Sequence, residues 1–214
     1  MKYGDLPKVL GIAKVNVDEM LFYQYLPIKL RHTNIVLEER LYGLTSILYD
    51  VIGDFKQEFG IEEYNNNYCY LTIKKMYQKD GCSFNRNGYH SDGFLTNDIN
   101  YIWCDKNPTI FNTTNFDLTL DDNISISEMA HQADKNKEKF YPENTLLRLN
   151  QYNIHKVSEV KELTLRTFIK VSFSKDKYDL KGNSINYKLG YNWEMRERNQ
   201  ERNIPQDIEA NNNQ

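Results

Sequence analysis

Short strand-like segments follow one another through most of this chain after residue 67, and this succession constrains the fold more than any other feature. They are rich in aromatic and β-branched residues, which strands favour. No helical segments alternate regularly with them, so we do not expect a parallel, doubly wound sheet. The order predicts a mainly β domain of antiparallel strands, a sandwich or a jelly roll. The predicted strands are 68–77, 99–105, 109–112, 116–120, 145–152 and 165–174.

One amphipathic helix precedes the strands and is expected to run from about Val36 to Phe59. Its apolar residues recur at steps of three and four, which predicts a single stripe packed on a sheet. A polar segment, 125–140, looks like a second helix or an ordered insert, with Ser127 as a candidate N-cap. The stripe consists of Leu37, Leu41, Leu44, Ile47, Leu48, Val51, Ile52 and Phe55.

The length of 214 residues predicts one domain, which we expect to cover residues 1–193. Within it we expect helical support over about 1–64, core strands over about 68–174 and an insert over about 112–142. The order alone suggests that this insert covers the mouth of a site. The charged, Asn-rich tail, 194–214, is expected to begin as a helix and to end in disorder.

Charge and composition exclude several classes of protein. The net charge of −3 argues against long nucleic acid as a partner. Three cysteines without a Cys-x-x-Cys spacing argue against a disulfide framework or a zinc knuckle. No run approaches the roughly 20 apolar residues of a membrane span, and no apolar leader begins the chain. We therefore expect a cytoplasmic protein with no membrane partner.

The stretch GYHSDGF, residues 88–94, contains a pattern that is typical of a metal site. In an extended segment, His90 and Asp92 point to the same face. One imidazole and one carboxylate make two-thirds of the facial triad that holds Fe(II) in non-haem oxygenases. His131 lies in a polar segment and is expected to be solvated. His155 directly follows a predicted strand, so it is the expected third ligand.

A basic residue follows the distal histidine in sequence: Arg166 lies 11 positions after His155. With the His-x-Asp pair, this arrangement resembles the Fe(II)/2-oxoglutarate-dependent dioxygenases over about residues 68–174. The stretch LLRLNQYNIHKVSEV resembles the closing strands of that family. The stretches YLTIKKMYQKDG and YHSDGF resemble the opening strands of its prolyl-hydroxylase-like branch.

The resemblance implies a double-stranded β-helix (a cupin-like jelly roll) that uses Fe(II), O2 and 2-oxoglutarate as cosubstrate. It implies hydroxylation of a small polar metabolite, a nucleotide or a protein side chain, with release of succinate and CO2. Arg166 would hold the remote carboxylate of the cosubstrate, because a guanidinium binds carboxylates with two parallel hydrogen bonds. Lys170, on the same strand face, is the alternative residue for this contact with the carboxylate. Phe168 stands where part of the family has a hydroxyl, so Tyr77 is the candidate for that group.

Substrate contacts are expected from residues near the metal ligands and on the next strand: Arg86, Tyr89, Tyr101 and Trp103. Two alternatives stay open. The chain could be a facial-triad iron enzyme that does not use 2-oxoglutarate. It could also be a non-catalytic β-sandwich binding module.

Overall fold

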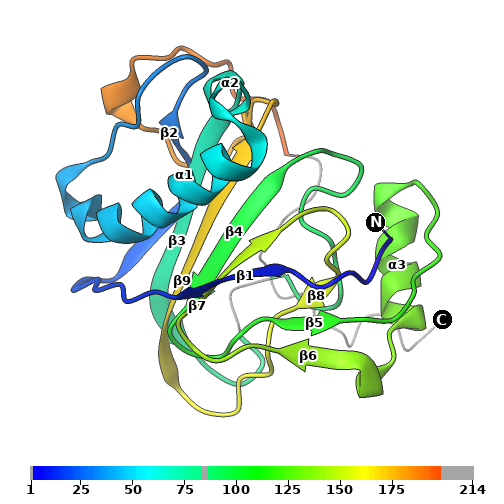
Figure 1. Cartoon of the computed structure of the whole chain (residues 1–214). Coiled ribbons are helices and arrows are strands. Elements are labelled where there is room, and N and C mark those ends of the chain that lie inside the picture. Colours follow the sequence, from blue (N-terminus) through cyan, green and yellow to red (C-terminus); the bar gives the residue numbers. More distant parts are fainter. Residues whose placement is uncertain (1, 83–85, 199–214) are drawn as a thin grey trace.

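The computed structural model describes residues 2–82 and 86–198 (Figure 1). Within these ranges nine strands form two antiparallel sheets, in the orders β1-β7-β4-β9-β3-β2 and β6-β5-β8. This confirms a mainly β fold with antiparallel strands. The strands are β1 Lys8–Ile12, β2 Leu21–Lys29, β3 Tyr68–Gln78, β4 Ile99–Cys104, β5 Ile110–Asn112, β6 Glu138–Phe140, β7 Thr145–Leu149, β8 His155–Lys156 and β9 Thr164–Ser174.

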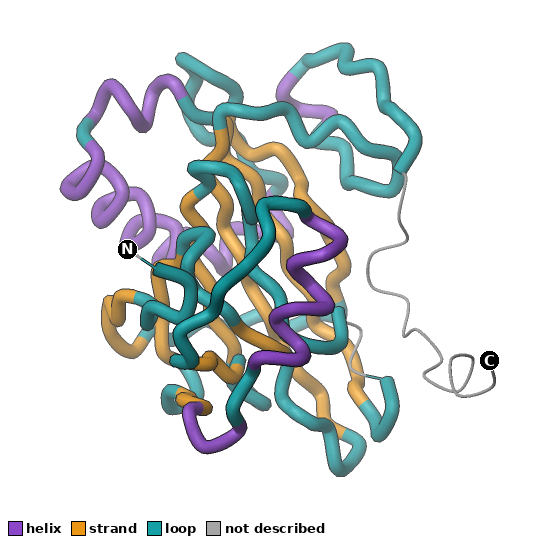
Figure 2. The backbone as a smooth tube through the Cα atoms, turned by 90° about the vertical axis from the view of Figure 1, so that its right-hand side faces the viewer, coloured by secondary structure: helices purple, strands orange, loops and turns teal. Residues whose placement is uncertain are grey.

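The helices in the described ranges are few and short. They are η1 Glu39–Leu44, α1 Thr45–Phe59, α2 Ile61–Asn66, α3 Asp122–Gln132, η2 Lys135–Lys137 and η3 Tyr187–Leu189. Helices α1 and α3 lie far apart, and α3 faces the viewer in Figure 2. Among the described helices, none has both the length and the apolar character that crossing a bilayer requires.

The apolar stripe of α1 packs on one face of the six-stranded sheet, as predicted. Its buried residues join a core with Ile73 of β3 and Val171 of β9. The ring of Phe55 stacks on Phe173 of β9, with ring centroids 4.0 Å apart. The predicted start at Val36 was wrong, because the N–H of Val36 donates to the carbonyl of Ile28 and holds this stretch against β2.

The residues before this helix also differ from the expectation. The expected helical support begins instead with two strands, β1 and β2, which form the two edges of the six-stranded sheet. Of the tail, residues 194–198 are not helical, since Arg196 exchanges backbone hydrogen bonds with Asp179 and Lys181. The rest of the expected tail lies outside the described residues.

The segment between the two halves of the site was predicted only in part. Helix α3 begins at Asp122 and is capped by the side chain of Asp121 rather than by Ser127. Residues 116–120 do not form the predicted strand. The side chains of Gln132 and Glu128 on α3 bind the backbone of this stretch and take the place of a strand partner.

The second face of the six-stranded sheet points toward the three-stranded sheet. Strands β3 and β9 pair over their full length, so Thr72 lies opposite Lys170 and Met76 opposite Arg166. Directly opposed residues in an antiparallel pair share a face. Apolar contacts between the two sheets, including Ile102, close part of this space. The remainder is a cavity.

Candidate metal centre

The loop at residues 88–93 is shaped by its two glycines. Gly88 has φ +79° and Gly93 has φ +76°, values that side chains with a Cβ rarely adopt. The expected extended segment is only one residue long: His90 forms an isolated bridge to His155, and a turn begins at Asp92. The two histidines exchange both backbone hydrogen bonds, each at 2.9 Å.

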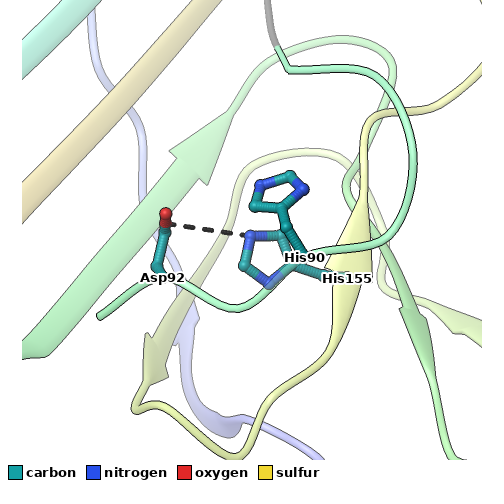
Figure 3. A group of neighbouring side chains, drawn as sticks. All are labelled: His90, Asp92 and His155. Carbon is teal, nitrogen blue, oxygen red and sulfur yellow. Dashed lines mark ion pairs between the residues drawn. The ribbon is translucent and has the colours of Figure 1, made fainter. Parts of the chain in front are cut away.

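Three side chains converge at this point (Figure 3). One potential ligand atom from each of His90, Asp92 and His155 lies within 4.8 Å of the others. Nε2 of His155 is 3.7 Å from Oδ2 of Asp92, and the two imidazole rings have centroids 4.5 Å apart. The structure therefore brings together the three residues that the sequence predicts as metal ligands.

Both imidazoles are held in the tautomer that suits a metal ligand. Nδ1 of His90 lies 3.0 Å from the carbonyl oxygen of Gly88, and Nδ1 of His155 lies 2.9 Å from that of Asn153. A carbonyl oxygen only accepts hydrogen bonds, so each Nδ1 must carry the proton. Each Nε2 then keeps a lone pair with which it can bind a metal ion.

Hydrogen bonds from the surrounding chain fix the two ligand segments to each other. The hydroxyl of Ser91 donates to the carbonyl of Gln151 at 2.6 Å, and the side-chain oxygen of Gln151 accepts from the N–H of Leu95 at 3.1 Å. On the distal side, the amide of Asn153 donates to the carbonyl of Asp5 at 2.8 Å. The side chains of Ser91 and Gln151 therefore help to hold the two ligand segments together.

The charges in the site favour metal binding at neutral pH. Burial, with a contribution from His155, lowers the pKa of His90 to about 3. Burial also lowers the pKa of His155, so both imidazoles are neutral and able to coordinate. Burial acts to raise the pKa of Asp92, but Lys170 and the two histidines outweigh it and the pKa is lowered, so the carboxylate is ionised.

Lys170 lies beside the three ligands. Its ammonium group is 3.1 Å from Oδ2 of Asp92 and 3.2 Å from the hydroxyl of Tyr25. Burial acts to lower the pKa of Lys170, but Asp92 and Tyr25 raise it above its ordinary value. The site thus contains a lysine-carboxylate pair, with Lys170 buried and Asp92 half-buried, in addition to the two imidazoles.

A cavity of about 500 Å³ opens from the three ligands along the six-stranded sheet. Arg166 lines it, is 3% exposed, and donates from Nε to the carbonyl of Lys106 at 2.8 Å. Arg86 and Lys170 line the same cavity. Of the ten residues predicted for the site, these three and the three metal ligands lie together.

The other four predicted residues lie elsewhere. Tyr77, the candidate hydroxyl for the cosubstrate, is 51% exposed and is not among the described residues that line the cavity. Tyr101 and Trp103 are on the helix-covered face of β4, where they donate to Asp54 and to the carbonyl of Ala13. Tyr89 packs in a separate apolar cluster and donates its hydroxyl to Glu138.

The error on β4 is one of strand parity. Alternation along β4 places Tyr101 and Trp103 on one face and Asn100 and Ile102 on the other. It does not say which of the two faces lines the cavity. The cavity is lined by Asn100 and Ile102, which were not predicted to contact the substrate. The larger aromatic pair is buried under α1. Large aromatic rings suit a helix-sheet interface as well as a ligand pocket, so residue size gave no guidance.

The sequence interpretation also missed cavity residues. Lys74 lines the cavity and is 5% exposed; a charged residue in the middle of a strand of buried character is the signal that would have found it. Tyr25 and Tyr178 line the cavity as well, with their rings edge to face at 5.1 Å. Tyr25 has φ +48° at an irregular point of β2, and no pattern in the sequence indicates this.

Comparison of the chain with models of known protein families, with curated proteins and with solved structures gives no match.

Proposed function

We propose that this protein is an Fe(II)- and 2-oxoglutarate-dependent oxygenase that hydroxylates a C–H bond of a small polar metabolite, a nucleotide or a protein side chain. One observation carries the proposal. Two imidazoles and a carboxylate converge from distant parts of the chain, at a cavity whose wall also presents the guanidinium of Arg166.

The order of the strands supports a double-stranded β-helix. If the His90 bridge is counted as a short strand beside β8, the smaller sheet reads His90-β8-β5-β6. The larger sheet contains β3-β9-β4-β7 at its centre. Along the chain, β3, β4, β7 and β9 belong to the larger sheet, and the strands or bridge between them, at His90, β5, β6 and β8, belong to the smaller one. Two facing sheets built by such alternation are the arrangement of a jelly roll.

The donor set fits Fe(II). Two neutral imidazoles and one carboxylate are the ligands of the facial triad, which leaves further coordination positions open. When bound, the iron supplies activation of O2, with 2-oxoglutarate oxidised to succinate and CO2, so that one oxygen atom enters succinate and the other the substrate. His90, Asp92 and His155 are the residues that would hold it.

Arg166 is better placed than Lys170 to bind the remote carboxylate of the cosubstrate. Both side chains lie on the cavity face of β9, and four residues of strand separate their Cα atoms by about 13 Å. The ammonium of Lys170 already contacts Asp92 at the metal end. The guanidinium of Arg166 lies at the far end, where its bond to Lys106 holds its orientation.

The charge of the cavity also suits acidic ligands. Among the described residues that line it, eight are Lys or Arg and four are Asp, although the whole chain has a net charge of −3. This local excess of positive charge raises the local concentration of anions such as a dicarboxylate. The volume of about 500 Å³ is within the range of small-ligand pockets.

Anaerobic titration with Fe(II) and 2-oxoglutarate tests the proposal. The complex should show a weak visible absorption band, and aerobic turnover should convert 2-oxoglutarate to succinate. Both signals should be lost in His90→Ala and His155→Ala. His131→Ala is the matched control, because His131 is exposed on α3 and should leave both signals unchanged. Wild-type protein that folds, binds Fe(II) and gives neither signal would contradict the proposal.

A further inference from the structure

Three cationic side chains lie along one wall of the cavity. Lys74 comes from β3, and Arg166 and Lys170 come from β9; their exposed fractions are 5%, 3% and 8%. Lys74 is paired with Phe168, which stands midway between the other two on the same face of β9. Lys74 is therefore the diagonal neighbour of both cations, with diagonal Cα separations of about 7–8 Å.

Three cations so close together repel one another. Removing a cation from water carries a free-energy cost that only hydrogen bonds and opposite charge offset. Lys170 has Asp92 as its partner, whereas Arg166 has the neutral carbonyl of Lys106. Burial, together with Lys170 and Arg166, lowers the pKa of Lys74 to about 8. An anion bound between Lys74 and Arg166 would neutralise this repulsion.

We propose that Lys74 is a second cationic contact for the remote carboxylate of 2-oxoglutarate, beside Arg166, and that it makes the site selective for a dicarboxylic oxo acid. This inference rests on the proposed function. Phe168 has no hydroxyl to offer the carboxylate, and Tyr77 points away from the cavity wall. Lys74 lies on this wall and brings both a hydrogen-bond donor and a charge.

The neighbouring residue provides a matched control. Lys75 follows Lys74 on β3 and so points to the opposite face, where its ammonium group donates to the carbonyl of Val17. Lys75→Met removes the same chemical group from the same strand without changing the cavity. Lys74→Arg keeps the charge at the proposed contact.

The experiment measures equilibrium binding of two oxo acids to the Mn²⁺-loaded protein by calorimetry. 2-Oxopentanoate has the same 2-oxo acid group as 2-oxoglutarate, with a methyl group in place of the remote carboxylate. Lys74→Met should weaken 2-oxoglutarate binding at least tenfold and leave 2-oxopentanoate binding unchanged. Lys75→Met should leave both affinities unchanged, and Lys74→Arg should keep the preference for 2-oxoglutarate.

The outcomes separate this inference from the proposed function. Wild-type protein that binds Mn²⁺ but shows no preference for 2-oxoglutarate over 2-oxopentanoate would overturn both. A wild-type preference that persists in Lys74→Met would overturn the role of Lys74 and leave the proposed function standing. If circular dichroism shows that Lys74→Met does not fold, Lys74→Gln replaces it, and persistence of the preference in that variant would be equally decisive.

Discussion

The ammonium group of Lys170 lies 3.1 Å from Oδ2 of Asp92, and the same oxygen lies 3.7 Å from Nε2 of His155. The lysine therefore contacts the carboxylate that would hold a metal ion. In the metal-free protein it balances the negative charge of Asp92. When a divalent cation binds, two cationic groups share one carboxylate, so we expect Lys170 to oppose metal binding until an anionic ligand arrives.

Lys170→Met should change how strongly a metal stabilises the protein. Removing Lys170 leaves the half-buried carboxylate of Asp92 without its cation, so the metal-free variant should lose about 1–3 kcal/mol of unfolding free energy. Mn²⁺ would then neutralise Asp92 without competition. The increase in Tm on addition of Mn²⁺, measured without oxo acid, should be larger in Lys170→Met than in wild type. An equal increase in both proteins would show that Lys170 does not oppose the metal.

The two glycines of the ligand loop should differ in their tolerance of alanine. Gly88→Ala has open space around the new Cβ and should lose only about 1 kcal/mol for its positive φ. Gly93→Ala carries the same cost of a positive φ, and its Cβ would also meet Thr96 Oγ1 at 2.7 Å and Asp98 Cβ at 3.0 Å. Chemical denaturation should therefore rank Gly93→Ala as clearly less stable than Gly88→Ala. The reverse order would contradict this loop geometry.

Substitutions on the two faces of β4 should separate stability from activity. Tyr101→Phe removes a hydrogen bond to the carboxylate of Asp54, which should lower the unfolding free energy by about 1.5–3 kcal/mol. It should leave the conversion of 2-oxoglutarate to succinate unchanged, because Tyr101 faces α1. Ile102→Ala, on the cavity face, should alter that conversion at temperatures where both variants are folded. Succinate assays beside thermal unfolding curves make this comparison.

The affinity for 2-oxoglutarate should depend on pH through Lys74. Burial lowers the pKa of Lys74 most, its neighbours Lys170 and Arg166 on β9 lower it further, and Asp92 acts to raise it. With a pKa of about 8, the free protein loses this charge as the pH rises above 8 and must regain a proton to bind the anion. Affinity should then fall by up to tenfold per pH unit between pH 8 and 9. This fall in affinity should be much shallower in Lys74→Met. Parallel curves of affinity against pH for the variant and the wild type would contradict the prediction.

The sequence predicts the three converging ligands because residue type and spacing carry that information. It could not predict that a histidine bridge, rather than a regular strand, aligns His90 with His155, because that pairing depends on contacts between distant segments. The predicted strands of the large sheet are close to those observed, since the density of aromatic and β-branched residues marks them. The strands β1 and β2 were missed because they contain glycine, proline and polar residues that weaken the pattern.

The backbone hydrogen bonds between residues 90 and 155 place two donor groups on a frame made of main-chain atoms alone. Neither of these two hydrogen bonds involves the side chain of His90 or His155. We therefore expect that either imidazole can be exchanged for another ligand while this backbone pairing is kept. The scaffold is therefore suited to redesign, in which substitutions at positions 90 and 155 change which cation binds.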